Sequence, residues 1–494
     1  MKSGSSSNTE NDDNKKQEAD DDLKKAEEAL FADGQLEVQV KTIRLSVDKN
    51  AEFGKSVGLH QKIVKTERYQ PKLILEKLII EQEVVTDWST GKTVRGNIEE
   101  IGPKKSKITW QMLAWLAQMV SGYNIPMDRL AKILSSEIKG FSSGRISSYI
   151  SNIATMLAPI YLVLAELLSE ADKWNGDDTR SNVLEINAKI ADESIGTEEE
   201  ALTPLVEKIS EVLPRVSKLK NGDGFKKQLS VSSLIGKSNP LDPRSTIFFF
   251  RTHVGDLGNL LSALLAMRRP SNKKLKIQTD ELIANRPERL FEELFDIQYF
   301  GCAFHGRRPF HRYRERDPDL CFYMLRAFLL LNRTESLIDR LGRTRKNVKR
   351  IRQKYAKRVW DLILQKCNQA TESGKLYPEH TLYKACKYIE RHYESLTKYI
   401  EHPEMDLSNN ISERILRVEK IMLDSSKFRK TENGRVAIDI IRTVIMTCSA
   451  AKVPVIPYLT YVFKNHKQVA ERPHDFTPYA YALKMDQDKR SKAS

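Results

Sequence analysis

The sequence predicts an α/β fold combined with a large α-helical part. Apolar runs of strand length alternate with helical periodicity between about residues 173 and 311, as expected of a mixed sheet covered by helices. Beyond residue 312 almost every segment has helical periodicity. A β-rich stretch and a helical stretch precede the mixed region. At 494 residues the chain is long enough for roughly two to four domains.

Composition and charge favour a polyanionic partner. The formal net charge is +15, with Lys and Arg spread along most of the chain, and such a balance favours nucleic acid. The N-terminus has no apolar signal segment, and no uninterrupted apolar run approaches the roughly 18 residues of a membrane span. We therefore expect a cytoplasmic protein that binds DNA and has no membrane partner.

The cysteines favour neither a disulfide framework nor a thiolate zinc ribbon. They lie far apart and include no Cys-x-x-Cys pair. We expect reduced, mostly structural thiols at Cys302, Cys321, Cys367, Cys386 and Cys448.

The N-terminal region divides into three segments. Residues 1–34 are mostly polar and charged and predict a disordered acidic leader. Apolar and polar residues alternate in residues 35–104, which predicts a small β-rich module. Residues 105–172 predict three helices, with a glycine-containing turn at Ser142-Ser-Gly144 before the third. This arrangement suits a helix-turn-helix that binds DNA, and a helical bundle connecting two domains is the alternative.

Residues 173–311 predict the first part of a sheet-based core. The acidic, then Ser-, Gly- and Lys-rich stretch 187–242 is interpreted as an inserted helix followed by a loop. The elements expected after it are strand 246–250, helix 257–267, a strand ending at Asp280, helix 288–295 and strand 297–304. This alternation predicts a mixed α/β sheet.

Residues 312–404 predict a helical, basic insertion. The segment Arg343–Arg358 carries nine Lys or Arg and no acid, so no acid four residues away neutralises it. We interpret it as a surface that contacts phosphates, and a solvated helix face is the alternative. The candidate DNA-binding residues on it are Arg345, Lys346, Lys349, Arg350 and Lys354. Residues 405–465 predict further helices of the core, and residues 466–494 a tail.

Three carboxylates are the candidate site. Asp177 lies in Asn175-Gly-Asp-Asp-Thr179, Asp280 closes a strand-like run, and Glu413 lies on a late helix. Each has a structural reading: Asp177 and Asp280 as turn formers, and Glu413 as part of a capping box after an N-cap at Asn410. Together, two acids at strands and one on a helix form the ligand set of a two-metal phosphoryl-transfer site, because hard divalent cations prefer carboxylate oxygens.

Four segments, in order, resemble the IS66 family of transposases. Asn409-Asn-Ile-Ser-Glu-Arg-Ile-Leu-Arg417 resembles the family's C-terminal signature, Asp-Asn-Asn-x-x-Glu-Arg-x-Leu-Arg. Cys302-Ala-Phe-His-Gly-Arg-Arg-Pro-Phe310 is similar to the family's Cys-Trp-Ala-His-Ala-Arg-Arg-x-Phe. Gly176-Asp-Asp-Thr179 is similar to its Ala-Asp-Glu-Thr, and Ile125–Leu134 to its Leu-Pro-Leu-x-Arg segment. The resemblance covers about residues 105–480.

The resemblance implies an RNase H-like catalytic core interrupted by the helical insertion 312–404. It implies a DDE triad of Asp177, Asp280 and Glu413 that holds two Mg²⁺ or Mn²⁺ ions, cuts DNA at the ends of an insertion sequence and joins the freed 3′-hydroxyl to target DNA. The implied partners are double-stranded DNA, both terminal repeats and target, further copies of the chain on that DNA, and accessory transposition proteins. The cysteine-rich zinc module usual in the family is replaced here by the β-rich stretch.

The residues around these motifs have expected roles as well. Arg414 and Arg417 follow Glu413 by one and four residues, so Arg417 shares its helix face and either could contact the DNA backbone. Cys302 and His305 have half of a zinc-site spacing, and a structural pair near the sheet edge is the preferred interpretation. The motif residues that complete this set are Arg307, Arg308, Asn409 and Asn410.

Two other functions fit the same residues. The chain is alternatively a decayed or repurposed relative that binds DNA through its basic helices without cutting it. It is also compatible with an RNase H-like nuclease that cuts without joining. The presence of an acid at all three triad positions favours the enzyme, because a protein that only binds DNA needs no metal ligands.

Overall fold

The computed structural model describes ten stretches of the chain in two compact units. The described residues are 38–45, 57–69, 75–95, 101–103, 106–137, 141–197, 200–216, 229–270, 273–280 and 283–493. The expected leader, residues 1–34, lies outside them. One unit comprises residues 1–113 with 128–143, and the other comprises residues 114–127 with 144–494.

The first unit contains the β-rich region expected from the alternating sequence. Its strands are β1 (Val38–Leu45), β2 (Val57–Tyr69), β3 (Leu75–Asp87) and β4 (Thr93–Arg95). The long strand β3 is central, because it pairs with β1 in parallel and with β2 and β4 in antiparallel fashion. The turn between β3 and β4 is closed by Asp87, which accepts hydrogen bonds from the backbone and side chain of Ser89.

The helical stretch 105–172 is divided between the two units. Its helices are α2 (Trp110–Ala117), α3 (Met127–Glu137) and α4 (Ser143–Ser169). Most of α4 belongs to the second unit, where the Tyr161 hydroxyl donates a hydrogen bond to the carbonyl of Phe250 at 2.8 Å and its ring stacks on Phe249 at 4.6 Å. By length and composition α4 alone among the described helices could cross a membrane, yet 56% of its apolar window is buried in the protein, as in a core helix.

The second unit is built on a mixed five-stranded sheet. Its strands are β5 (Lys173–Arg180), β6 (Leu229–Lys237), β7 (Thr246–Val254), β8 (Leu275–Gln278) and β9 (Ile297–Phe300). They lie in the order β7-β6-β5-β8-β9. Strands β5, β8 and β9 are parallel to one another, whereas β6 and β7 form an antiparallel extension beside β5. The α/β class expected for this region is confirmed.

Two sequence expectations for this sheet were wrong. Strand β6 lies inside the stretch 187–242, which was expected to hold only a helix and a loop. Three serines interrupt its apolar pattern. The Ser232 hydroxyl is hydrogen-bonded to His253 at 2.9 Å, whereas the buried Ser233 hydroxyl has no hydrogen-bond partner among the described residues. Strand β9 ends at Phe300 rather than near residue 304, because Cys302 is the N-cap of the helix α9 (Ala303–Arg312).

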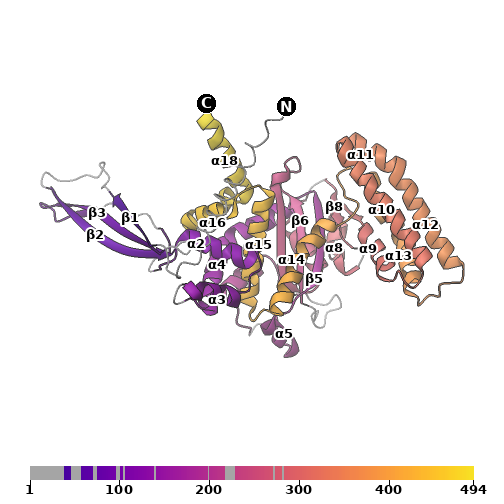
Figure 1. The fold of residues 1–494 in the computed structure, drawn as a ribbon, viewed down its shortest axis with the longest axis horizontal. Coiled ribbons are helices and arrows are strands. Elements are labelled where there is room, and N and C mark those ends of the chain that lie inside the picture. The colour runs from indigo at the N-terminus through magenta and orange to yellow at the C-terminus, as the bar shows by residue number, and fades with distance from the viewer. Residues whose placement is uncertain are drawn as a thin grey trace, which may run out of the picture. The chain divides into compact units, whose positions relative to one another are not determined.

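The outer edge of β7 is covered by helix α15 (Glu432–Ala450). The backbone N–H groups of Phe248, Phe250 and Thr252 donate to the side chains of Thr447, Thr443 and Asp439, respectively. The donors on the strand and the acceptors on the helix are equally spaced, because two residues of a strand and one turn of a helix both advance about 6 Å. An edge strand that would otherwise leave its N–H groups unpaired is thereby satisfied. Figure 1 shows α14 (Asn410–Ser426) and α15 against the sheet.

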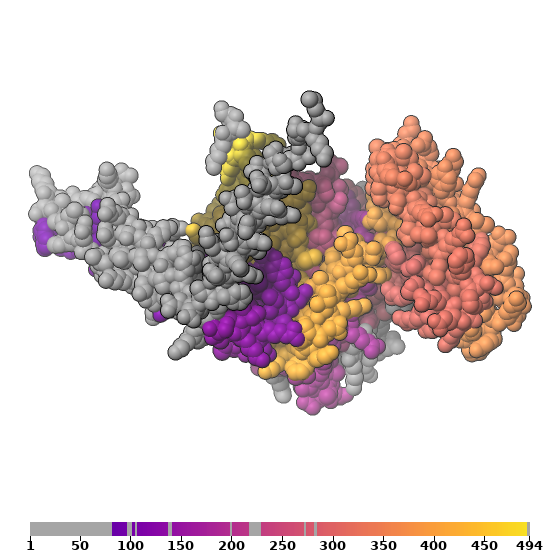
Figure 2. All heavy atoms as spheres, viewed as in Figure 1, coloured from indigo at the N-terminus to yellow at the C-terminus, as the bar shows by residue number. Residues whose placement is uncertain are grey.

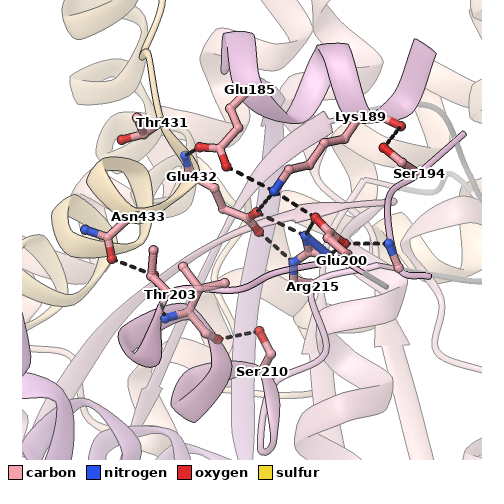
Figure 3. A network of polar contacts seen from close by, with 12 residues as sticks. Glu185, Lys189, Ser194, Glu200, Thr203, Ser210, Arg215, Thr431, Glu432 and Asn433 are labelled. Carbon is pink, nitrogen blue, oxygen red and sulfur yellow. Dashed lines mark hydrogen bonds and ion pairs between the residues drawn. The ribbon is translucent and has the colours of Figure 1, made fainter. Parts of the chain in front are cut away.

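A charged network ties the start of α15 to the segment between β5 and β6, which includes α5 (Leu184–Ala191) and α6 (Pro204–Ser210) (Figure 3). The Arg215 guanidinium bonds to Glu432 at 2.7 Å and to Glu200 at 2.8 Å. Lys189 on α5 pairs with Glu200 at 2.8 Å and with Glu185 at 3.0 Å. Arg215, Glu200 and Glu432 are nearly buried, so each charge depends on the others for compensation.

The predicted helical insertion forms a compact body (Figure 2). Its apolar core also includes Phe300 of β9 and Phe310 of α9. Its helices are α10 (Pro318–Leu341), α11 (Arg345–Ile351), α12 (Lys357–Glu372) and α13 (Thr381–Thr397), with a π-helical turn between α11 and α12. Around Trp360 the core includes Phe328 and Ile389. The remaining helices of the unit are α7 (Leu257–Met267), α8 (Arg289–Leu294), α16 (Val455–Lys464), α17 (His466–Glu471) and α18 (Pro478–Ala493). The expected tail is therefore helical over most of its length.

Candidate active site

The three candidate carboxylates lie on adjoining elements of the second unit. Asp177 is within the central strand β5, rather than at its end as expected, and Asp280 follows β8 by two residues. These parallel strands pair Asn175 with Gln278, and each aspartate lies two residues beyond its partner in that pair, so both reach the same edge of the sheet. Glu413 is in the first turn of α14, which packs on β5 and β6.

The acids share one pocket of about 550 Å³. Both acidic and basic side chains line it. Its lining comprises Asp177, Asp178, Thr179, Asp280, Phe304, His305, Arg307, Arg308, His311, Arg312, Asn410, Glu413, Leu416, Arg417 and Lys420. The pocket therefore brings together all three candidate acids with Arg307, Arg308 and Arg417, as well as Lys420, which the sequence did not single out.

The surroundings of Asp177 disfavour its charged form. Burial raises its pKa, and the nearby charges of Asp280, Glu413 and Asp178 raise it further, to about 7, from an ordinary value of 3.8. A backbone hydrogen bond of 3.0 Å from Asp178 opposes the rise. Because Asp280 and Glu413 both act on it, the three carboxylates form one mutually repelling group that a cation or a proton must neutralise.

A buried amide network holds the three acid-bearing elements in place. Asn175 of β5 donates to Gln278 of β8 at 2.9 Å and to the Asn409 side chain at 3.3 Å. Asn409 is the N-cap residue of α14, and its own side chain donates to the carbonyl of Gly176 at 2.5 Å. Asn409, not Asn410, is therefore the N-cap, and its side chain fixes α14 to β5 instead of capping the helix.

Asp280 and Glu413 each contact a further side chain. The Asn285 side-chain amide donates to Asp280, and Asn285 is itself buried. Glu413 Oε1 lies 3.4 Å from Arg308 Nη2 and 3.6 Å from His305 Nδ1, and it makes no hydrogen bond with good geometry. These contacts fix both side chains toward the pocket.

Cys302 and His305 are at the site rather than at a remote edge. Cys302 is fully buried, and its sulfur accepts a hydrogen bond from the backbone N–H of Asn409 at 3.2 Å. Burial raises the pKa of its thiol to about 11. His305 lines the pocket, and burial, with Arg308 beside it, lowers its pKa to about 4, so that its ring is neutral near pH 7.

Some of the residues expected to contact DNA lie at or beside the pocket, and the others lie on the helical insertion. Arg417 lines the pocket on the same helix face as Glu413, whereas Arg414 is exposed outside it. On the insertion, Lys346, Arg350 and Lys354 are exposed, and none pairs with an acid among the described residues. Lys349 pairs with Glu401 at 3.1 Å, and Arg345 lies 3.8 Å from Glu404. The acids that neutralise the last two come from other elements, which spacing along one helix could not reveal.

Sequence reasoning missed the residues beneath the acids. Asn175 and Gln278 are buried polar side chains in central strands. An amide in an otherwise apolar strand is a signal available from sequence, because such a group needs buried hydrogen-bond partners. The identity of those partners depends on the fold.

Comparison with known protein families finds a match within this part of the chain. A family model described as Transposase IS66 family matches residues 289–437. The chain carries an IS66-family transposase domain. No curated protein and no solved structure matches the chain. The matched segment runs from α8 into α15 and includes Cys302, His305 and Glu413. The IS66 resemblance read from the motifs is thereby confirmed, while Asp177 and Asp280 precede the matched IS66 segment.

Proposed function

We propose that this chain is the DDE transposase of an insertion sequence. It would cut DNA strands at the ends of the element and transfer them to target DNA, with Asp177, Asp280 and Glu413 as metal ligands. The observation that carries this proposal is that Asp177, Asp280 and Glu413 line one pocket together with basic side chains, in a chain with an IS66-family domain. Three acids that repel one another in one pocket are stabilised by a bound cation.

The residues of the pocket fit two hard divalent cations, Mg²⁺ or Mn²⁺. Carboxylate oxygens are the donors these ions prefer. The buried Oε1 of Glu413 has no hydrogen-bond partner, and Asp177 is destabilised as an anion, so both gain from a bound cation. Two such ions would activate the attacking water or hydroxyl and stabilise the leaving oxygen.

The protein's own residues would bind and orient the DNA. Arg307, Arg312 and Arg417 line the same pocket as the acids, and none of them pairs with an acid among the described residues. Guanidinium groups at this position suit the phosphates on either side of the scissile bond. We propose that the mixed sheet carrying the acids is the RNase H-like core and that residues 312–404 are its insertion.

The wider partners follow from the same proposal. The exposed cations Lys346, Arg350 and Lys354 would contact phosphates of double-stranded DNA outside the pocket. The DNA would comprise the element's terminal repeats and the target. Assembly of several copies on paired ends, accessory transposition proteins and a cytoplasmic location are proposed on the IS66 domain alone.

Strand-transfer assays test the proposal. The full chain is incubated with its own element ends, a target plasmid and Mg²⁺ or Mn²⁺, and both cleavage and joined products are measured. Asp177→Asn, Asp280→Asn and Glu413→Gln should each abolish both products while leaving DNA binding intact, because each removes a metal ligand and no phosphate contact. The matched control is Asp424→Asn, an exposed acid on the same helix as Glu413.

The outcomes separate the candidate functions. Cleavage without joining would identify a nuclease. DNA binding without metal-dependent cleavage by the parent chain would identify a binding protein. Unchanged cleavage in Asp280→Asn would remove that residue from the ligand set.

A further inference from the structure

A second set of metal-ligand atoms lies directly behind Glu413. Cys302 is the N-cap of α9, His305 is in the first turn of that helix, and Glu413 is in the first turn of α14. One ligand atom from each, a sulfur, a ring nitrogen and a carboxylate oxygen, lies within 4.8 Å of the other two. The two helices thus bring together three residues that span 112 residues of sequence, from 302 to 413.

Two of the three ligands are buried polar groups without hydrogen bonds. His305 Nδ1 and Glu413 Oε1 lie 3.6 Å apart, and neither has a hydrogen-bond partner. A buried polar atom left in this state destabilises the folded protein. The Nδ1 atom of His305 therefore faces Glu413 with no hydrogen bond of its own and is placed to act as a metal ligand.

We propose that Cys302, His305 and Glu413 form a site for one thiophilic divalent cation, of which Zn²⁺ is the type, with water as the fourth ligand. Glu413 would then belong to two alternative cation sites. The hard site uses it with Asp177 and Asp280, and the thiophilic site uses it with Cys302 and His305. The existence of the thiophilic site does not depend on the proposed transposase activity, whereas its inhibitory consequence does.

The geometry suits tetrahedral zinc with small adjustments. Zinc binds sulfur at about 2.3 Å and nitrogen or oxygen at about 2.0–2.2 Å, which sets its ligand atoms roughly 3.3–3.6 Å apart. The nitrogen–oxygen distance of 3.6 Å nearly satisfies this already, and the 4.8 Å limit on the others leaves a contraction of only about 1 Å. One sulfur–metal bond forms as the thiol proton leaves to solvent.

The surroundings of the trio have one supporting and one opposing feature. The backbone N–H of Asn409 donates to the Cys302 sulfur at 3.2 Å, as outer hydrogen bonds to metal ligands commonly do. The Arg308 guanidinium lies 3.4 Å from Glu413 Oε1 and would repel a cation there. Its side chain is 50% exposed, so it can turn into solvent when the metal binds.

The shared ligand gives the site a consequence for catalysis. An ion held by sulfur and nitrogen draws Glu413 away from Asp177 and Asp280. Low concentrations of Zn²⁺ would therefore inhibit Mg²⁺-dependent cleavage. Added DNA, whether element ends or target, should not relieve this inhibition. None of the three zinc ligands is a basic side chain expected to contact phosphate.

Cobalt binding tests the site without any activity assay. Co²⁺ is titrated into the reduced full-length chain, and the thiolate-to-cobalt absorption band is followed, with Zn²⁺ as competitor. We expect one Co²⁺ per chain, displaced by Zn²⁺. The band should vanish in Cys302→Ser, whose hydroxyl can still accept the Asn409 hydrogen bond but is a poor zinc ligand, and binding should weaken at least tenfold in His305→Gln and Glu413→Gln.

Matched controls and the inhibition assay complete the test. Cys321→Ser changes another buried thiol, and Asp177→Asn changes the hard site alone, so both should keep the cobalt band. No band in the parent chain, or the same band in Cys302→Ser, would overturn the thiophilic site. If the parent chain cleaves DNA, Zn²⁺ should inhibit it, and the zinc concentration needed, measured against each variant's own zinc-free rate, should rise in Cys302→Ser but not in Cys321→Ser. A cobalt band without zinc inhibition would overturn the sharing of Glu413.

Discussion

The Asn409 side chain donates a 2.5 Å hydrogen bond to the carbonyl of Gly176, the residue before Asp177. Asn409 in turn precedes Glu413 by four residues, at the N-cap of α14. One buried amide therefore links the first acid's strand to the third acid's helix. A two-metal site of the kind proposed tolerates only small displacements of its ligands, so we expect this bond to help set the distance between Asp177 and Glu413.

Asn409→Asp should lower cleavage about 10- to 100-fold with little effect on DNA binding. Asn409 positions the proposed metal ligands but does not itself bind the metal. The substitution keeps an acceptor for Asn175 but turns the donor facing Gly176 into an oxygen. Single-turnover cleavage as a function of Mn²⁺ concentration measures the effect, and excess Mn²⁺ should restore part of the rate. Asn368→Asp, on the insertion, is the control. A variant with full activity at low Mn²⁺ would show that α14 is positioned by other contacts.

The metal-free protein should lose stability as pH rises through the window set by Asp177. The folded chain binds this proton with a pKa of about 7, whereas the ordinary value is 3.8. Between these values the folded state holds more protons than the unfolded state, so the free energy of unfolding falls with rising pH and levels off above about pH 7. The Asp177→Asn variant lacks this titrating carboxyl group, so its free energy of unfolding should not fall with pH for this reason.

Melting temperatures at several pH values measure this linkage. In the absence of divalent ions, Asp177→Asn should gain stability over the parent chain as the buffer changes from about pH 5 to about pH 8. Added Mg²⁺ should raise the melting temperature of the parent more than that of the variant. Parallel curves for the two proteins would mean that Asp177 titrates normally.

The basic segment of the insertion should bind phosphates through its unpaired cations. Arg350→Glu combined with Lys354→Glu should weaken DNA binding and reduce the slope of log affinity against log salt by roughly one unit for each phosphate that is no longer neutralised. Lys349→Glu should have a smaller effect, because Glu401 already neutralises that lysine. Fluorescence anisotropy with labelled duplex at several salt concentrations gives the slopes. If the double variant leaves the slope unchanged, this segment is only a solvated face.

Glu419→Gln should destabilise the protein by about 3–5 kcal/mol, because the buried Arg442 guanidinium loses its acid and Arg435 keeps only Asp439. Glu419 lies on α14 and pairs with Arg435 at 2.8 Å and with Arg442, and all three side chains are almost wholly buried. Urea denaturation measures the loss, with the exposed neighbour Lys420→Ala as the control. A loss under about 1 kcal/mol would mean that the cluster can neutralise itself without this acid.

The local pattern of the sequence predicted many of the elements and little of their arrangement. Helix α7 was predicted at its observed bounds, because its apolar spacing and the capping residue Asp256 are local signals. Strand β6 was missed, because serines in a strand are explained only by partners on a neighbouring strand. The motif at Cys302 was placed on a strand for a similar reason, since nothing local shows that the chain turns there into α9.

The sequence by itself determined the IS66 resemblance and the helical character of the chain beyond residue 312, and it predicted the three candidate acids, because these depend on residue types and their order along the chain. Only the tertiary structure decided that Asp177, Asp280 and Glu413 share one pocket, that Arg345 and Lys349 are paired while Arg350 is not, and that Cys302 and His305 face Glu413. The physical reason is the range of the interactions involved. Periodicity and capping act within a few residues, whereas the charge that shifts a pKa and the ligands that share a cation come from elements more than a hundred residues apart.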